Sequence, residues 1–285
     1  MHRNSCVTLV LFALAVSSTA TAAPIMFSVS GDTTAASIQG TVDAFRTALG
    51  APNNGNGAST VGGRREINWD GGGSTANSPG GNPFNVFLNT RGAQFTTPGI
   101  DLVQAPEAGG LNGGLESLFF NPTYGATFNT FSSARLFVPV GSNIVDALFF
   151  LPGSAGATPA TVSGFGAVFT DVDTLGSTSL NFFDSNNVSL GSFLVEPGKV
   201  TDGSLSFLGV TFTTEQIARV RITMGTSVLG PNDNPAGGTD IVAMDDFIYA
   251  EPVAVQPVPE PSTLLLFGTG AVALVSRVRR RVWRR

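Results

Sequence analysis

Short apolar runs, separated by turn residues, recur through the second half of this 285-residue chain. Runs of this length with about ten residues from one to the next are typical of all-β proteins. Between two of them, Asp184-Ser-Asn-Asn187 predicts a hairpin loop, because Asp and Asn tolerate turn dihedrals. The predicted strands are Arg135–Val138, Ile144–Leu151, Thr161–Thr170, Thr178–Phe183, Val188–Val195, Leu205–Thr213, Ala218–Met224 and Asp240–Tyr249. The pattern predicts one large β-sandwich.

The first half of the chain predicts one helix among loops. Four apolar residues recur at helical spacing, and Gly50 follows them as a stop signal. These residues are Ile38, Val42, Phe45 and Leu49. We therefore predict a short amphipathic helix, Ala36–Leu49, whose apolar stripe packs into the core. Segments 51–63 and 71–81 are rich in Gly, Asn, Ser and Pro and are predicted loops on either side of the polar segment 64–70.

The N-terminal segment 1–22 has the features of a secretory signal peptide. It carries one basic residue, Arg3, an apolar core from Val7 to Val16, and then a run of small residues. Cleavage after this segment would remove Cys6 and His2, the chain's only cysteine and only histidine. We therefore expect an exported ectodomain over residues 23–252.

The C-terminal segment 253–285 reads as a membrane tail. Its prolines Pro257, Pro259 and Pro261 form a joint that neither a sheet nor a helix interior continues. An uncharged run, Leu264–Val275, follows and leads into six arginines, which the positive-inside rule keeps in the cytoplasm. The run is shorter than the ~20 residues of an ordinary spanning helix. We predict a short transmembrane helix that thins the bilayer, lets its arginines snorkel or resides in the membrane only briefly.

The order of these parts resembles the PEP-CTERM sorting signal of Gram-negative bacteria. The motif residues are Val258, Pro259, Glu260, Pro261 and Ser262. The resemblance implies an exported protein that is held briefly in the inner membrane. An exosortase then processes it near Glu260 and it reaches the cell surface or the extracellular matrix. The resemblance covers about a tenth of the chain. The alternative is an ordinary single-pass anchor with a proline linker.

The ectodomain is acidic and has neither cysteine nor histidine. Nineteen acidic residues face eight basic ones in this segment, a formal net charge of −11. Such a surface repels phosphate backbones and attracts cations, so nucleic acid is not an expected partner. No disulfide can form, and the fold must depend on its core, its hydrogen bonds or a metal.

The segment 64–70 holds Trp69, the only tryptophan of the ectodomain. On a strand, Arg65, Ile67 and Trp69 would share one face. An aromatic ring beside hydrogen-bonding side chains is a usual way to hold a sugar ring. The candidate ligand-binding residues are therefore Arg65, Asn68, Trp69 and Asp70. The alternative is a buried tryptophan with ion pairs around it.

Two aspartates, Asp171 and Asp173, follow an apolar run and are candidate metal ligands. On an extended segment both carboxylates lie on the same side, which suits a hard cation with oxygen ligands such as Ca²⁺. The offsets do not fit an EF-hand loop. Simple turn chemistry is the alternative.

A second aspartate pair, Asp245 and Asp246, lies inside the last apolar strand. Regular alternation would place the two side chains on opposite faces, with at least one of them half-buried. The Asp-Asp-Phe strand resembles the last strand of jelly-roll modules in secreted carbohydrate-binding and PEP-CTERM proteins. That resemblance implies a jelly-roll-like sandwich and a structural Ca²⁺ at one of the two aspartates. The alternative partner is an arginine, Arg135 or Arg91.

Without histidine or cysteine, the ectodomain lacks the residues of Ser-His-Asp and Cys-His hydrolases and of the usual zinc sites. We expect a non-catalytic binding or structural module associated with exopolysaccharide. The alternative is a carboxylate-dependent enzyme that cleaves envelope glycans, which needs two carboxyls about 5–10 Å apart.

Overall fold

The computed structural model describes residues 23–73, 75–76, 79–109 and 113–255. The predicted signal peptide 1–22 lies outside the described residues, as do the sorting motif and the predicted hydrophobic helix within 256–285. In the part that is described, no helix has the length and apolar character needed to cross a membrane.

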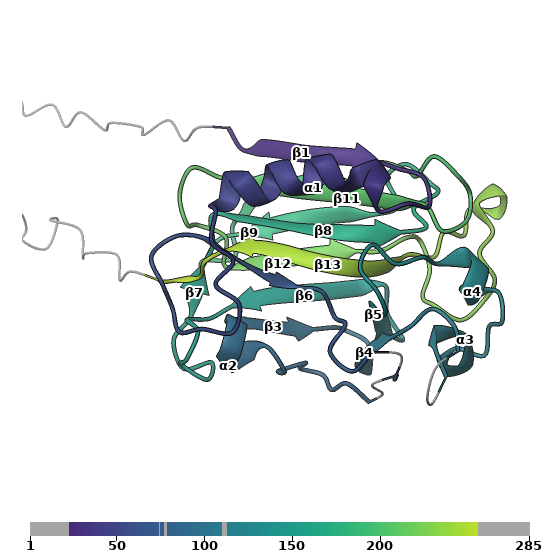
Figure 1. Ribbon diagram of the computed structural model, residues 1–285, viewed down its shortest axis with the longest axis horizontal. Helices are drawn as coiled ribbons and strands as arrows, with labels where there is room; N and C mark the ends of the chain where they lie inside the picture. Colours follow the sequence, from purple (N-terminus) through teal and green to yellow (C-terminus); the bar gives the residue numbers. More distant parts are fainter. Residues whose placement is uncertain (1–22, 74, 77–78, 110–112, 256–285) are drawn as a thin grey trace, which may run out of the picture.

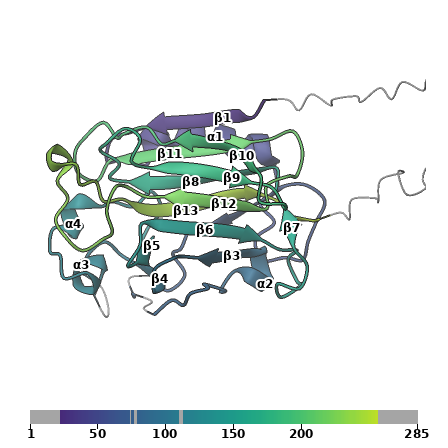
Figure 2. The ribbon, with the colours of Figure 1, turned by 180° about the vertical axis from the view of Figure 1, so that it is seen from behind.

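Two antiparallel sheets stack face to face and form the body of the molecule (Figures 1 and 2). The first has seven strands in the order β1-β11-β8-β13-β5-β4, with β2 paired to β13, and the second has five in the order β10-β9-β12-β6-β3. The strands are β1 (Ile25–Ser30), β2 (Arg64–Ile67), β3 (Ala93–Thr96), β4 (Asp101–Ala105), β5 (Leu136–Val140), β6 (Ile144–Phe149), β8 (Gly164–Thr170), β9 (Ser179–Phe183), β10 (Ser189–Leu194), β11 (Leu205–Thr211), β12 (Arg219–Thr223) and β13 (Ala243–Ala250), and a small extra pair joins β7 (Ala160–Thr161) to β14 (Val253–Ala254). The predicted all-β sandwich with a short helix is confirmed. The two-sheet arrangement is also compatible with the predicted jelly-roll-like fold.

Each predicted strand of the second half overlaps an observed one. The longest prediction, Thr161–Thr170, is divided into β7 and β8. The hairpin loop also forms, because Asp184 Oδ1 accepts hydrogen bonds from the backbone N–H groups of Asn186 and Val188 at 2.9 and 2.8 Å. Local apolar patterning is therefore sufficient to locate the strands of this half.

The predicted helix α1 (Ala36–Leu49) covers the outer face of the first sheet, against β1 and β11 (Figure 1). Its buried residues are Ile38, Val42, Phe45 and Leu49, as the spacing predicts. Phe45 lies directly over β11, where a Cβ on Gly209 would come within 2.7 Å of its ring. The absence of a side chain at this position lets the helix approach the sheet closely. Shorter helices are α2 (Leu88–Arg91), α3 (Leu115–Leu118), α4 (Tyr124–Thr127) and the 3₁₀ turn η1 (Pro235–Gly237).

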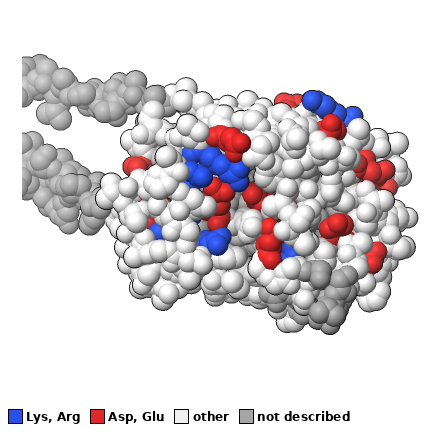
Figure 3. Space-filling view, viewed as in Figure 1, with Lys and Arg blue, Asp and Glu red and all other residues white. Residues whose placement is uncertain are grey.

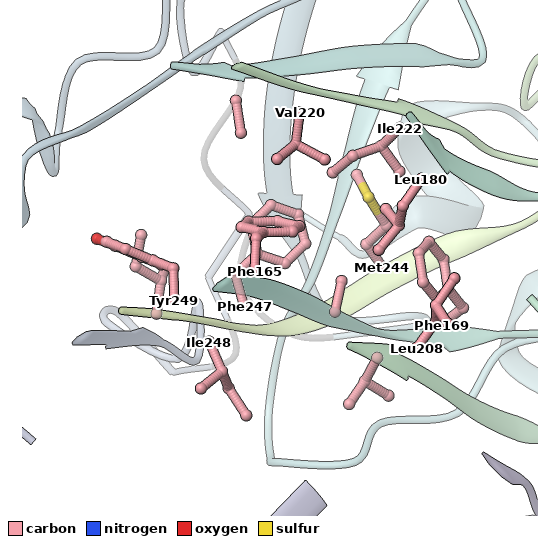
Figure 4. Packing of buried hydrophobic residues seen from close by; sticks show 14 of the residues in the cluster. Phe165, Phe169, Leu180, Leu208, Val220, Ile222, Met244, Phe247, Ile248 and Tyr249 are labelled. Carbon is pink, nitrogen blue, oxygen red and sulfur yellow. The ribbon is translucent and has the colours of Figure 1, made fainter. Parts of the chain in front are cut away.

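An apolar core rich in aromatic rings fills the space between the sheets. Figure 4 shows Met244 and Phe247 of β13 pointing to the same side, toward Val220 and Ile222 of the second sheet, whereas Ile248 points away. Phe247 lies within ring-packing distance of several other aromatic residues. These are Trp69, Phe95, Phe137 and Phe165.

Candidate metal centre

Three carboxylates converge at one end of the sandwich and form the acidic cluster Asp171, Asp173 and Asp233. One oxygen from each lies within 4.8 Å of the other two. Two oxygens bound to one Ca²⁺ at about 2.3–2.6 Å lie at most about 5 Å apart, so this spacing fits a shared calcium ion. The cluster brings together the predicted ligands Asp171 and Asp173, and it adds Asp233 from 60 residues further along the chain.

Asp171 is positioned by the end of β8. The strand stops at Thr170, and Asp171 turns the chain with a φ of 68°, a left-handed conformation that Asp tolerates better than most residues. Its backbone N–H donates to the carbonyl of Ser204, and its Oδ1 accepts from the N–H of Gly203 at 3.2 Å. These bonds fix the carboxylate, while its second oxygen meets no hydrogen-bond donor among the described residues.

Asp233 is positioned by the loop between β12 and β13. Its Oδ1 accepts a hydrogen bond from the backbone N–H of Ile241 at 3.0 Å, and this bond joins the middle of the loop to its C-terminal end. Two residues around α4 hold the same loop, since Asn121 Nδ2 donates to the Pro231 carbonyl and the Tyr124 hydroxyl accepts from the Gly230 N–H. Asp233 is not among the metal ligands predicted from the sequence. The only local signal is its Asn-Asp-Asn context, which is also typical of an ordinary turn.

Within the described part of the chain, two buried oxygens of the cluster have no hydrogen-bond partner, Asp171 Oδ2 and Asp173 Oδ2. The Asp171 side chain is fully buried. Burial, together with the charges of Asp173 and Asp233, raises the pKa of Asp171 to about 9. Burial and the neighbouring acids also raise the pKa of Asp173 and of Asp233. Unsatisfied buried oxygens are rare in folded proteins, and a cation would neutralise and coordinate them.

A cleft of about 540 Å³ opens beside the cluster, and Asp173 and Asp233 line it. This acidic cleft is also lined by Thr123, Thr127, Thr201, Asp202, Asn232, Asn234, Pro235 and Ala236. Its remaining polar groups are amides, hydroxyls and one further carboxylate. All of these supply the oxygen atoms that Ca²⁺ prefers.

The other predicted metal ligands, Asp245 and Asp246, have protein partners instead. Both carboxylates contact the Ser132 hydroxyl, at 3.4 Å from Asp245 Oδ1 and 2.6 Å from Asp246 Oδ1. Asp245 also accepts from the backbone N–H of Phe131, and Asp246 Oδ2 lies 3.6 Å from Arg46. Arg46 is therefore the arginine beside this pair, not Arg135 or Arg91. Burial raises the pKa of both aspartates, to the larger extent for Asp245.

The expectation that Asp245 and Asp246 face opposite ways is wrong. Strand β13 pairs Met244 with Phe169 but Phe247 with Ala167, so one extra residue is inserted between them. This β-bulge keeps Met244 and Phe247 on the same inner face and leaves both aspartates on the outer face.

The structure also corrects the sugar-stacking hypothesis for Trp69. Its side chain is 1% exposed and stacks on Phe137 at a centroid distance of 3.8 Å, so no sugar ring can reach it. Arg65 is equally buried, with Nε and Nη2 each 2.7 Å from a carboxylate oxygen of Glu251. The alternative interpretation, a buried tryptophan with ion pairs around it, describes the segment. Asn68 and Asp70 point the other way and bond each other at 2.8 Å.

A second hollow lies on the outer face of the first sheet, beside α1, where Figure 3 shows basic and acidic side chains gathered together. This charged pocket has a volume of about 280 Å³. Its lining residues are Arg46, Asn53, Glu66, Asn68, Arg91, Ser132 and Asp246. Arg46 joins its two acids, since its Nη2 lies 2.8 Å from Glu66 and 3.6 Å from Asp246. The charges of this pocket therefore neutralise one another.

Comparison with protein families shows that residues 257–281 match the PEP-CTERM protein-sorting motif. The chain carries a PEP-CTERM sorting motif. It is therefore an exported protein, routed through the membrane to the cell surface and processed by an exosortase. The predicted motif, Val258 to Ser262, lies within the matched residues. Comparison with curated proteins and with solved structures found no match.

Proposed function

We propose that this PEP-CTERM protein is a non-catalytic, calcium-binding module of the Gram-negative cell surface or extracellular matrix, associated there with exopolysaccharide. The observation that carries the calcium assignment is the fully buried Asp171, which belongs to a cluster with the spacing of metal ligands and whose Oδ2 has no donor in the part of the chain that the structure describes. The sorting motif supports the location at the cell surface. Extracellular modules bind calcium with dissociation constants of about 10⁻⁴–10⁻³ M, so a loose site is suited to that location.

Calcium at this cluster would stabilise the ectodomain. Asp171 follows β8, whereas Asp233 belongs to the loop between β12 and β13, so one ion would link two loops that are distant in sequence. Such a link compensates for the lack of any cysteine in the ectodomain. Because calcium binds only the folded state, it raises the melting temperature by mass action.

The test is thermal melting of the processed protein during a calcium titration. We expect the melting temperature to rise and to saturate between micromolar and millimolar calcium. Asp173→Asn should abolish the rise, and Asp246→Asn, which alters the pair beside Arg46, should keep it. If chelation leaves the wild-type melting curve unchanged, the calcium proposal fails.

The alternative function, cleavage of envelope glycans, would use the charged pocket. Glu66 and Asp246 both approach the Nη2 atom of Arg46, and burial raises the pKa of Asp246, as a general acid requires. The glycan-cleaving function would be supported if the wild-type protein released reducing sugar ends from exopolysaccharide and the Glu66→Gln variant did not. We expect no release, because both acids are engaged by Arg46.

A further inference from the structure

The acidic cluster offers ligands to a calcium ion from one side only. Asp171 is fully buried, whereas Asp173 and Asp233 line the acidic cleft. A calcium ion held by all three would therefore lie on the floor of the cleft. Its opposite side would face the open volume of about 540 Å³.

The cluster alone does not complete a calcium coordination shell. One oxygen from each of the three carboxylates has the required spacing, and Asp171 Oδ1 and Asp233 Oδ1 each accept a backbone N–H group. Because Ca²⁺ takes six to eight oxygens, about three to five positions remain for water or for ligand oxygens. Those positions face the cleft.

The charge around the ion selects a neutral ligand. Three carboxylates exceed the charge of one Ca²⁺ by one unit, and Asp202 adds another acid at the cleft. The whole ectodomain has a formal net charge of −11. A carboxylate or phosphate on the ligand would be repelled, whereas a hydroxyl coordinates calcium without adding charge.

We propose that calcium in the acidic cleft binds a neutral polysaccharide through two adjacent sugar hydroxyls, which replace two calcium-bound waters. Asn232 and Thr201 at the cleft offer an amide and a hydroxyl to other sugar hydroxyls, and Pro235 with Ala236 offers an apolar surface to the ring carbons. This inference rests on the proposed function, since it needs both the calcium ion and the polysaccharide.

The position of the cleft agrees with this role. The cleft is lined by residues of α4 and its flank, and α4 lies at the end of the sandwich opposite β7 (Figure 1). Strand β14 pairs with β7 and immediately precedes the sorting motif in sequence. The cleft therefore lies at the end of the sandwich opposite β14, the last described strand before the sorting motif.

The experiment measures binding of the processed protein to immobilised mannan, a neutral polymer with adjacent hydroxyls, in calcium and in excess chelator. Polygalacturonate provides the anionic comparison, and O-methylated mannan removes the hydroxyls. Melting in the same buffers reports calcium binding separately. We expect mannan binding in calcium only, with little binding to either control polymer. Asn232→Ala should weaken mannan binding about tenfold, as for the loss of one or two hydrogen bonds, with an unchanged calcium effect on melting.

The outcomes separate this inference from the proposed function. If calcium raises the melting temperature but mannan does not bind, or binds equally in chelator, the sugar contact at calcium is refuted and the calcium module stands. Stronger binding of polygalacturonate than of mannan overturns the selection of a neutral ligand. If calcium has no effect on melting, the proposed function itself falls.

Discussion

Buried charges in this protein are held by several partners at once. Besides its ion pair with Glu251, Arg65 donates to four backbone carbonyls. These belong to Gly55, Gly57, Ala58 and Thr90. One side chain thus connects β2, the loop 51–63 and the segment after β13, which makes Arg65 structural.

Replacing Arg65 should therefore be costly. In Arg65→Ala, Glu251 stays buried without its cation, and we expect a loss of about 3–5 kcal/mol in the free energy of unfolding. Arg221→Ala is the control, because Arg221 is partly exposed and its partner Asp146 keeps Arg219, so the loss should stay below about 1 kcal/mol. Denaturant unfolding measures both, and similar losses would contradict the structural role.

The acidic cluster predicts a pH dependence with a definite sign. The pKa of Asp171 rises from its ordinary 3.8 to about 9 in the folded protein. Between these values the metal-free folded state binds more protons than the unfolded state, so stability should fall as the pH rises from 5 to 8. Calcium needs ionised carboxylates, so its stabilising effect should grow over the same range.

Melting of dialysed protein at pH 5 and pH 8, with and without calcium, measures both trends. Asp171→Asn should remove the rise in melting temperature that calcium causes. It should also reduce the fall in melting temperature between pH 5 and pH 8. The rest of the fall should remain, because burial also raises the pKa of Asp245. Equal calcium effects at the two pH values would contradict the proposed ligand set.

Among the elements, the contact of α1 with the first sheet depends on a glycine. Gly209→Ala would place a Cβ within 2.7 Å of the Phe45 ring, and we expect a destabilisation of about 1–3 kcal/mol. Gly40→Ala is the matched control within α1, where an added Cβ meets nothing within 4 Å. It should stabilise the protein by up to about 1 kcal/mol through helix propensity. Thermal melting of both variants checks the opposite signs.

The strands of the two halves differ in how far the sequence predicts them. Strands β5 to β13 consist of apolar runs with clear turns between them. By contrast, β1, β3 and β4 were not predicted, because each lies beside Gly- and Pro-rich or polar segments that obscure its pattern. Sheet pairing with distant strands stabilises them, as β1 does with β11, and no local pattern reports such pairing.

For the whole molecule, the sorting motif predicts the mass of the mature protein. Processing near Glu260 should remove the residues from Leu264 to Arg285, and intact-mass measurement on surface protein should show their absence. Replacing the six tail arginines by neutral residues should misorient or release the precursor, because each arginine costs about 2.5–3.5 kcal/mol at the bilayer centre. Surface protein that still ends at Arg285 would show a plain anchor.

The sequence by itself determined the sorting motif, the all-β class, helix α1 and most strands of the second half. These properties depend on residues that are near one another in the chain, so composition and periodicity report them. Only the tertiary structure showed that Trp69 is buried, that a bulge places Asp245 and Asp246 on one face, and that Asp233 joins Asp171 and Asp173. The physical reason is that burial, register and metal-ligand geometry depend on which distant segments pack together, and the pairing of sheets and loops decides that.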